Sequence, residues 1–540
     1  MNFASSACYG QDTEWVKVKY GRTTPSVDDW IAVFSPADFN GEDPKLCTAP
    51  IKFQYANYSA NYIYWGKGSI KLQLINQRSD FSVALFTSGL DNVRHRSSSD
   101  PALFYTLHAV TSFSDPSLID RSMQPKLIAV SEPISFKNPK APVFPRLAQG
   151  KTHDEMAVTW TSGYDIDEAY PFVEWGAVVS GAGGQAARAP AGRSPSTAAA
   201  CTTTRLGTRC RTGLWCGGRS TRSVLRPSPG QKSLQRVIVF GDMGKAERDG
   251  SNEFANYQPG SLNTTDTLIK DLDNYDIVFH IGDLPYANGY ISQWDQFTAQ
   301  VADITAKKPY MIASGNHERT WTNSGGFYDG KDSGGECGVP AETYYYYPAE
   351  NRAKFWYKVD YGMFRFCIAD SEHDWRVGTE QYKFIEQCLS TVDRKHQPWL
   401  IFAAHRVLGY SSNAWYGMEG SYEEPEGREH LQKLWQKYRS QCMTSEKSHY
   451  SGTMNGTIHV VAGGGGSHLS DYSTAIPMWS IYRDLDFGFV KLTAFNHSSL
   501  LFEYKKSSDG KVYDSFTIDR DYRDVLSCVH DSCFPTTLAS

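Results

Sequence analysis

Short runs in which apolar and polar residues alternate, each bounded by Gly, Pro, Asn or Asp, fill the first part of the chain. Such runs predict β-strands with one buried face, and several of them at this spacing indicate a β-sandwich. The clearest runs are 14–20, 29–34, 69–75 and 81–86. A proline-rich linker begins at Lys137, and a second β unit opens with 155–161 and 171–175. We therefore expect an N-terminal β-sandwich domain over residues 1–138 and a second domain over 139–235.

The pattern changes near residue 236, because strongly apolar strands now alternate with helix-like segments. The runs of strand length are 233–240, 275–280, 310–314, 364–369, 399–404 and 458–462. Helix-like segments at 379–389 and 427–439 lie between some of them. This alternation predicts an α/β layered domain whose sheets are buried on both faces. We expect that domain over residues 236–520, followed by a C-terminal tail at 521–540.

The stretch 177–230 differs from the rest of the chain. It contains eight arginines but no Asp, Glu, Lys, Ile, Phe, Tyr, Asn or His. A basic flexible linker or a nucleic-acid-binding arm is one interpretation. We favour another, that the segment is out of frame, because it leaves the preceding β unit half-finished. Trp215 is its one aromatic residue able to stack on a base, so we expect no nucleic-acid partner.

Composition excludes several classes of protein. The 540 residues are 40% hydrophobic and 14% aromatic, which is enough for buried cores and excludes a mainly disordered chain. The net charge of −5 does not suggest a protein that binds phosphate backbones along its whole length. No apolar run approaches the roughly 18 to 20 residues of a membrane helix, so we expect no membrane partner.

The features that bear on the cellular compartment are mixed. No signal peptide can be recognised at the start of the sequence. Four Asn-x-Ser/Thr sequons are candidates for glycosylation, at Asn57, Asn263, Asn455 and Asn496. The eleven cysteines cannot all pair, although Cys528 and Cys533 have a spacing that suits a small terminal disulfide. We expect a secreted, extracellular protein with a truncated N-terminus.

Candidate chemistry lies where the strands of the α/β domain end. Going along the chain, these strands are followed by Asp242, by Asp283 and Tyr286, by Asn316, and by His405. In α/β sheets ligand-binding groups gather at the carboxyl ends of strands. A Gly-Asp pair alone is more often a turn, and a lone histidine more often a core or rim residue. Together, these oxygen donors and one imidazole predict a metal site in which a shared carboxylate could bridge two cations.

Two motifs carry a resemblance to a known family: Gly-Asp-x-x-Tyr at 282–286 and Gly-Asn-His-Glu at 315–318. With the segments 332–338, 369–375 and 463–468, the chain resembles the large, N-terminally extended plant purple acid phosphatases, which are calcineurin-like metallophosphoesterases. The resemblance implies a β domain, a fibronectin type III-like domain over 139–235, and a catalytic αββα sandwich. The C-terminal part of the family's catalytic domain would span 456–520.

The resemblance also implies a binuclear centre that hydrolyses phosphate monoesters. The ferric ion would be bound by Asp242, by Tyr286, whose phenolate would make the protein purple, and by Asp283. Asp283 would bridge to a divalent metal, zinc, manganese or iron, which Asn316 and His405 also bind. The metal pair would neutralise the ester and acidify a water molecule. The expected partner is therefore a small phosphate ester, and the sequence is compatible with a homodimer.

Part of the family pattern is missing from this chain. His317 stands where it could hold phosphate or protonate the leaving group, but the loop 411–420 lacks the histidine pair of smaller relatives. The family's Gly-His-x-His motif, which supplies one imidazole to each metal, is absent, and 440–457 contains no apolar strand to carry it. The histidines that could substitute are His449, His459 and His468. We expect weak metal binding, weak or no hydrolysis, and apolar surface exposed by the missing strand.

Two other functions stay open on the sequence alone. One is a non-catalytic glycoprotein whose β domains and altered cleft bind phosphate or a partner. The other is a nucleotide pyrophosphatase or phosphodiesterase, which would use the same metal centre on a different ester.

Overall fold

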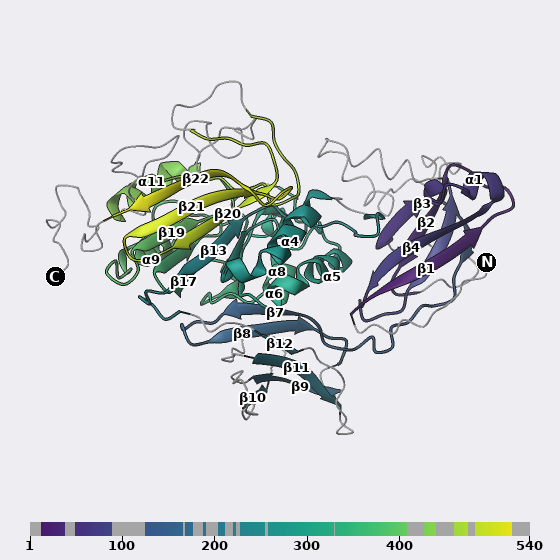
Figure 1. Cartoon of the computed structure of the whole chain (residues 1–540), viewed down its shortest axis with the longest axis horizontal. Helices are drawn as coiled ribbons and strands as arrows, with labels where there is room; N and C mark the ends of the chain where they lie inside the picture. The colour runs from purple at the N-terminus through teal and green to yellow at the C-terminus, as the bar shows by residue number, and fades with distance from the viewer. Residues whose placement is uncertain are drawn as a thin grey trace. The chain divides into compact units, whose positions relative to one another are not determined.

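The structure is a computed structural model that describes most of the chain (Figure 1). The described residues are 12–37, 49–88, 125–165, 168–175, 187–190, 203–210, 220–222, 227–253, 258–328, 330–407, 426–438, 458–472 and 481–520. They belong to two units. The N-terminal unit comprises Met1–Val143 with Ala246–Tyr257, and the second comprises Phe144–Lys245 with Gln258–Ser540.

The N-terminal unit contains two sheets of antiparallel strands. One pairs β1 (Thr13–Gly21) with β4 (Lys67–Ile75). The other has the order β14–β3–β2–β5–β6. Its strands are β2 (Asp29–Phe34), β3 (Lys52–Tyr55), β5 (Ser82–Thr87), β6 (Lys126–Val130) and β14 (Asn252–Glu253), and the short helical turns η1 (Ala56–Tyr58) and α1 (Tyr62–Trp65) follow β3. A segment remote in sequence therefore completes the edge of this sheet.

Alternation along the strands places the core between these two sheets, as the sequence predicts. In β1, Val16 and Val18 are buried, whereas Lys17 and Lys19 are exposed. The buried valines belong to one cluster with Ile31 of β2 and further apolar residues of β4 and β5. Two sheets with their apolar faces together make the β-sandwich that we expected.

The second unit begins with further antiparallel strands. β7 (Val143–Gln149) pairs with β8 (Met156–Thr161), and a four-stranded sheet has the order β10–β9–β11–β12. Its strands are β9 (Ala169–Trp175), β10 (Ala187–Pro190), β11 (Thr203–Cys210) and β12 (Ser220–Arg222). Three of these strands lie within 177–230. Whether that segment is out of frame stays a prediction, because pairing of its backbone does not test the reading frame.

Two larger sheets form the layered α/β part of this unit. The six-stranded sheet has the order β16–β15–β13–β20–β21–β22, and the three-stranded sheet the order β17–β18–β19. The strands are β13 (Gln235–Phe240), β15 (Ile277–Ile281), β16 (Tyr310–Ala313), β17 (Tyr357–Tyr361), β18 (Phe364–Ile368), β19 (Trp399–Ala403), β20 (Gly488–Ala494), β21 (Ser499–Lys506) and β22 (Val512–Asp519). Phe279 of β15 stacks on Phe366 of β18 with 4.1 Å between ring centroids, so the sheets share one core.

Helices cover the outer faces of the two sheets. Leu268 and Trp294, from helices α4 and α5, are buried against the six-stranded sheet, and Ile385 and Trp435, from α9 and α11, against the other. The helical segments are α4 (Gly260–Lys270), η5 (Leu272–Asn274), α5 (Ile291–Gln300), α6 (Ala302–Thr305), α7 (Asn316–Arg319), α8 (Val339–Tyr344), η6 (Arg352–Lys354), α9 (Glu380–Ser390) and α11 (Glu426–Tyr438). The predicted αββα sandwich is confirmed. Among the helices described, none is long and apolar enough to cross a membrane.

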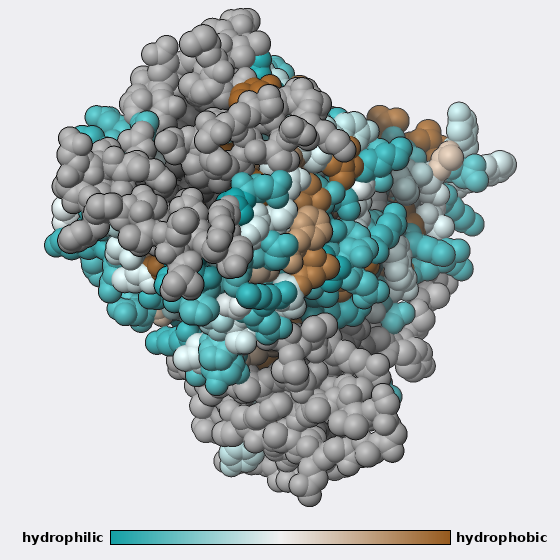
Figure 2. Space-filling view, turned by 60° about the vertical axis from the view of Figure 1, so that its left-hand side comes forward, coloured by the Kyte–Doolittle hydropathy of each residue, from teal (hydrophilic) through white to brown (hydrophobic). Residues whose placement is uncertain are grey.

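One predicted strand is wrong. Residues 458–462 are not in a strand, and Val460 and Val461 are 48% and 58% exposed. A strand needs a partner for its backbone N–H and C=O groups, and the preceding sequence contains no apolar strand to pair with it. Apolar side chains that we expected to be buried are therefore exposed, and Figure 2 shows hydrophobic residues gathered on one face of the molecule. Low solubility, which we expect from this exposed surface, stays a prediction.

Candidate metal centre

The strands of the six-stranded sheet deliver three candidate ligands to one edge. β13, β15 and β16 are parallel neighbours, so their carboxyl ends lie side by side. Asp242 follows β13, Asp283 follows β15, and Asn316 follows β16. His405 follows β19 of the other sheet. Residues separated by more than 160 positions therefore meet between the ends of the two sheets.

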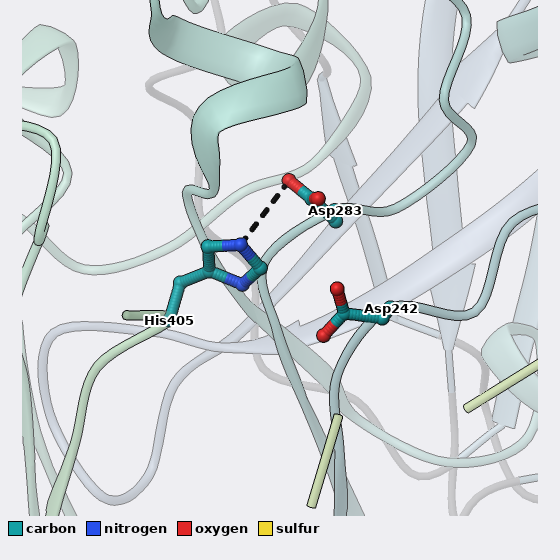
Figure 3. Close-up of side chains that lie close together, drawn as sticks. All are labelled: Asp242, Asp283 and His405. Atoms are coloured by element: carbon teal, nitrogen blue, oxygen red, sulfur yellow. Dashed lines mark ion pairs between the residues drawn. The ribbon is translucent and has the colours of Figure 1, made fainter. Parts of the chain in front are cut away.

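Asp242, Asp283 and His405 form a compact group (Figure 3). One ligand atom from each lies within 4.8 Å of the others. The Nε2 atom of His405 is 3.4 Å from Oδ1 of Asp283, and their side chains are 8% and 4% exposed. Two ligands that each lie about 2.0 to 2.5 Å from one cation are up to about 5 Å apart. This spacing suits one cation, or two neighbouring cations about 3.5 to 4 Å apart that share the carboxylate of Asp283.

Asn316 extends this group. Its Oδ1 atom lies 3.1 Å from Nε2 of His405, while its Nδ2 donates to Oδ2 of Asp332 at 3.0 Å. The other ring nitrogen of His405, Nδ1, lies 3.0 Å from the carbonyl oxygen of Ile281. A hydrogen bond from Nδ1–H to that carbonyl leaves Nε2 as the metal-facing atom, which is how proteins fix the tautomer of a ligating histidine.

Tyr286 contacts the carboxylate of Asp242. Its hydroxyl donates to Oδ1 of Asp242 at 2.9 Å and accepts from Oγ of Ser467 at 3.0 Å. Tyr286 is buried, with 4% of its surface accessible to solvent. A phenol oxygen next to the Asp242 carboxylate matches the pair that the family resemblance assigns to the ferric ion.

His317 lies beside the group. Its backbone N–H donates to Oδ1 of Asp283 at 3.0 Å, and its Nδ1 lies 2.9 Å from Oδ1 of Asn288. Its ring centroid is 4.3 Å from that of Tyr286. The structure brings all six predicted site residues into one region, and their roles as metal ligands and as catalytic residue stay predictions.

The backbone around these ligands is strained. Asp242, Asp283 and Tyr286 have φ angles of 58°, 51° and 53°, which side-chain-bearing residues adopt at a cost on the order of 1 kcal/mol. A Cβ atom on Gly282 would lie 2.5 Å from Nδ1 of His405, and one on Gly315 would lie 2.2 Å from Oδ1 of Asp283. These two glycines let the ligand loops approach each other.

Glu318 holds the strained turns in place. Its carboxylate accepts hydrogen bonds from the backbone N–H groups of Asp283 and Leu284, both at 2.8 Å, and from that of Gly315 at 3.0 Å. The side chain is buried, and burial together with Asp283 raises the pKa of Glu318 well above its usual range. A single side chain thus joins the loop after β15 to the loop after β16.

The charges of the group are unbalanced. Burial, helped by Asp283 and opposed by His405, raises the pKa of Asp242 to about 7. Burial disfavours a charged imidazole, but the carboxylates of Asp283 and Asp242 outweigh it and raise the pKa of His405 to about 9. Burial likewise opposes ionisation of Asp283, but His405 and His317 outweigh it and lower the pKa of that carboxyl. A buried and a half-buried carboxylate that share one imidazole fit a bound cation, because a cation would supply the missing positive charge.

Sequence reasoning gave no role to several residues of the site. Glu318, Asp332 and Ser467 lie in segments that carried the family resemblance, and Asn288 lies next to one. The signal that the sequence offered for Asn288 was its position in an Asn-Gly pair two residues after Tyr286, which favours a turn, and the structure has a φ of 50° there.

Other predicted residues lie away from this group or outside the described part of the chain. His459 and His468 do not belong to the group formed by the two aspartates and His405. Asn57, Asn263 and Asn496 are exposed, as glycosylation requires, but their modification stays a prediction. The predicted features that lie outside the described residues are Asn455, His449, Cys528, Cys533, the loop 411–420, the segment 440–457 and the tail 521–540.

Three family descriptions match the chain. "Fn3-like domain from Purple Acid Phosphatase" matches residues 4–106, "Calcineurin-like phosphoesterase" matches 235–439, and "Iron/zinc purple acid phosphatase-like protein C" matches 456–515. The Fn3-like match falls in the N-terminal unit, whereas we expected the fibronectin type III-like domain over 139–235. Strand patterns alone do not distinguish two neighbouring β domains. The predicted domain boundaries are not tested by these matches.

Similar proteins come from several plants. "Probable inactive purple acid phosphatase 27" of Arabidopsis thaliana is 56% identical over 590 aligned positions, which cover 98% of this chain and 91% of that protein. "Nucleotide pyrophosphatase/phosphodiesterase" of Hordeum vulgare is 80% identical over 334 positions, 58% of this chain and 91% of that protein. The solved structure of purple acid phosphatase PPD1 from yellow lupin seeds is 54% identical, covers 98% of this chain and 97% of its own, and superposes with a TM-score of 0.84.

The first of these alignments is longer than the chain itself. It spans 590 positions, against 540 residues here. The Arabidopsis protein therefore contains segments with no counterpart in this chain, although the alignment length does not place them.

Proposed function

We propose that this chain, which belongs to the purple acid phosphatase family, is a metal-dependent phosphomonoesterase whose activity is impaired by lost ligands. The family normally uses a binuclear metal centre. The observation that carries the proposal is the convergence of Asp242, Asp283 and His405 in a chain whose sequence lacks Gly-His-x-His. Three relatives that are 53% to 56% identical and cover 98% of this chain are named probable inactive purple acid phosphatases, which supports the impairment.

The residues present fit a metal pair. In the proposal, Asp242 and Tyr286 hold iron, Asn316 and His405 hold zinc, manganese or a second iron, and Asp283 contacts both. Bound metals would neutralise the ester's charge and acidify a water molecule. Each metal has three protein ligands in this arrangement, where the intact family motif would add an imidazole to each. We therefore expect weak binding of both.

The chain's own residues would position the substrate. Asn288 fixes Nδ1 of His317 at 2.9 Å, which leaves Nε2 for a phosphate oxygen or for a proton donated to the leaving group. Glu318 holds the backbone from which Asp283 and Asn316 project. Neither task depends on the missing motif, so some phosphate binding should survive.

Metal analysis of the purified full chain tests this proposal. We expect fewer than two metals per chain and slow hydrolysis of a chromogenic phosphate monoester. Tyr286→Phe should abolish any purple absorption after iron loading, while Asp374→Asn, at an exposed carboxylate that pairs with Arg376, should leave it unchanged. Inserting a strand with Gly-His-x-His after Arg439 should raise both metal content and turnover. Two metals with ordinary turnover in the unchanged chain would refute the impairment, and no metal binding at all would refute the centre.

A nucleotide pyrophosphatase or phosphodiesterase is the second candidate. It is favoured by the barley relative, which bears that name and is 80% identical over 334 positions. Parallel assays of a phosphate monoester, a phosphate diester and a dinucleoside pyrophosphate distinguish the candidates. Faster hydrolysis of the diester or pyrophosphate would replace the first proposal by the second. Retained phosphate binding without hydrolysis of any ester would favour a non-catalytic binding protein.

We also propose that the protein is secreted. A disulfide joins Cys367 of β18 to Cys388 of α9, and disulfides persist mainly in oxidising compartments. The exposed sequons at Asn57, Asn263 and Asn496 are compatible with passage through the secretory pathway. Digestion with an endoglycosidase should reduce the mass of the native protein, and an unchanged mass together with free thiols at Cys367 and Cys388 would contradict secretion.

A further inference from the structure

We propose that Asp332 is a positioning residue of the metal centre, which holds the side chain of Asn316 with its carbonyl oxygen toward the metal. The inference rests on the proposed function, because it treats Asn316 as a metal ligand. Asp332 belongs to the segment 332–338, which carried part of the family resemblance but received no role from it.

The chemistry of the amide makes its orientation decisive. An asparagine side chain presents one acceptor oxygen and one NH₂ group, and only the oxygen can bind a cation. The two orientations are nearly equal in shape, so a neighbour must select one. A carboxylate accepts hydrogen bonds and cannot donate them, and Oδ2 of Asp332 lies 3.0 Å from Nδ2 of Asn316. Oδ1 of Asn316 is then directed to Nε2 of His405, at 3.1 Å.

The segment that carries Asp332 is held by the ligand loops themselves. The N–H of Ser333 donates to the carbonyl of Thr320 at 3.1 Å, and the N–H of Gly338 donates to that of Glu318 at 2.8 Å. Both acceptors lie within or directly after α7, the short helix that begins with Asn316. Asp332 is therefore fixed relative to the residue that it orients.

A second carboxylate fastens this segment to the loop after β15. Glu336 accepts from the backbone N–H of Gly289 and from Nε1 of Trp294, each at 3.0 Å. A Cβ atom on Gly334 would lie 2.1 Å from the carbonyl oxygen of Asn288, so the two loops touch there. Asp332 itself is not part of the group formed by Asp242, Asp283 and His405. It acts through Asn316 and not as a ligand.

A double-mutant cycle tests this role. The full-length chain, Asp332→Ala, Asn316→Asp and the combined variant are titrated with Zn²⁺ and with Mn²⁺ in competition with a chromophoric chelator. The carboxylate introduced by Asn316→Asp presents an oxygen in either orientation, so the need for an orienting partner disappears. We expect Asp332→Ala to weaken metal affinity about 10- to 100-fold in the unchanged chain and to cause no loss in the Asn316→Asp background.

Asp332→Asn is the conservative variant. Its amide oxygen can still accept from Nδ2 of Asn316, so we expect an affinity within about threefold of the unchanged chain, on the scale of a retained neutral hydrogen bond. The melting temperature of the metal-free protein reveals whether Asp332→Ala folds. If it does not, Asp332→Leu, which has a similar volume and cannot accept a hydrogen bond, replaces it in the cycle.

Three results would overturn the inference. Equal losses from Asp332→Ala in both backgrounds would show that Asp332 acts through its charge or through the fold. An unchanged affinity in the single variant would show that Asn316 needs no orienting partner. Failure of the unchanged chain to bind either metal would refute the proposed function itself, and the positioning role with it.

Discussion

Two clusters of buried carboxylates, one in each unit, differ in their source of positive charge. In the N-terminal unit, Nζ of Lys52 pairs with the carboxylates of Glu247 and Asp249, and all three side chains are nearly inaccessible, at 2%, 4% and 0% exposed. In the second unit, Asp242 and Asp283 share His405. Each cluster sets two carboxylates against one basic side chain, which is a lysine in the first cluster and a histidine in the second.

The difference appears in the carboxyl groups themselves. Burial opposes ionisation of Asp249, but Lys52 outweighs it and lowers the pKa of that carboxyl, helped by hydrogen bonds from Ser251 and Gln73. Burial raises the pKa of Asp242 to about 7. Lys52 thus favours the ionised form of Asp249, whereas His405 does not offset the burial of Asp242. A cation bound at the proposed metal centre would supply the positive charge that favours ionisation of Asp242.

Removal of the cation from the complete cluster should have the largest effect. Lys52→Met removes the ammonium group that two buried carboxylates share, which should lower the free energy of unfolding by about 4 kcal/mol. Chemical denaturation monitored by fluorescence measures the loss. Lys17→Met, at an exposed position of β1, is the matched control and should change stability little. A loss from Lys52→Met no larger than that of the control would break the comparison.

Neutralising one carboxylate in each cluster should affect the stability of the metal-free protein differently. Asp249→Asn removes one of the two carboxylate partners of Lys52 and should destabilise the protein by about 2–3 kcal/mol. Asp242→Asn removes an unfavourable buried charge, so the metal-free protein should keep its stability near neutral pH, while metal affinity falls by about 100-fold or more. Melting temperatures with and without a chelator measure both effects. Destabilisation of the metal-free protein by Asp242→Asn would contradict the interpretation.

Glu336 provides a third case, a buried carboxyl with N–H donors but no cation. Burial, opposed by its hydrogen bonds from Gly289 and Trp294, raises the pKa of Glu336 to about 7. The folded state then binds more protons than the unfolded state, so this contribution is fully present below the usual pKa of about 4.3 and is lost as pH rises toward 7. We expect Glu336→Gln to reduce the fall of unfolding free energy over that range by up to about 1.4 kcal/mol per pH unit. Denaturation at several pH values measures this slope, and an unchanged slope would contradict the assignment.

An exposed ion pair should matter least. Nζ of Lys437 lies 3.2 Å from Oε1 of Glu386, and these side chains are 45% and 40% exposed. Water already solvates both charges, so Glu386→Gln should change unfolding free energy by no more than about 0.5 kcal/mol. A loss comparable to that of Asp249→Asn would show that burial does not set the cost of removing one partner of an ion pair.

Much of the fold could be predicted because the hydrophobic pattern of each strand or helix lies within its own residues. Alternation marked β1, and apolar runs marked β13, β15 and β16, which are buried on both faces. The run 458–462 shows the limit of this reasoning. Its residues suit a strand, but a strand also needs a neighbour, and pairing is a property of the whole sheet.

The same limit applies to the candidate site. A polar residue directly after an apolar strand can be recognised in the sequence, and a glycine precedes it at Asp242, Asp283 and Asn316. These three residues and His405, which follows an alanine, could therefore be selected together. The cysteines of the 367–388 disulfide and the hydrogen bond between Asn316 and Asp332 gave no comparable signal. They join residues whose approach depends on how loops and helices pack.

The residues that follow buried strands could be recognised from the amino-acid sequence, because the apolar run and the residues after it are neighbours in the chain. Which of these side chains contact a partner depends on the tertiary structure. Lys52 and Asp249 are 197 positions apart, and His405 and Asn316 are 89 apart. Chain connectivity constrains such pairs very little, so their contact follows from the packing of sheets and loops.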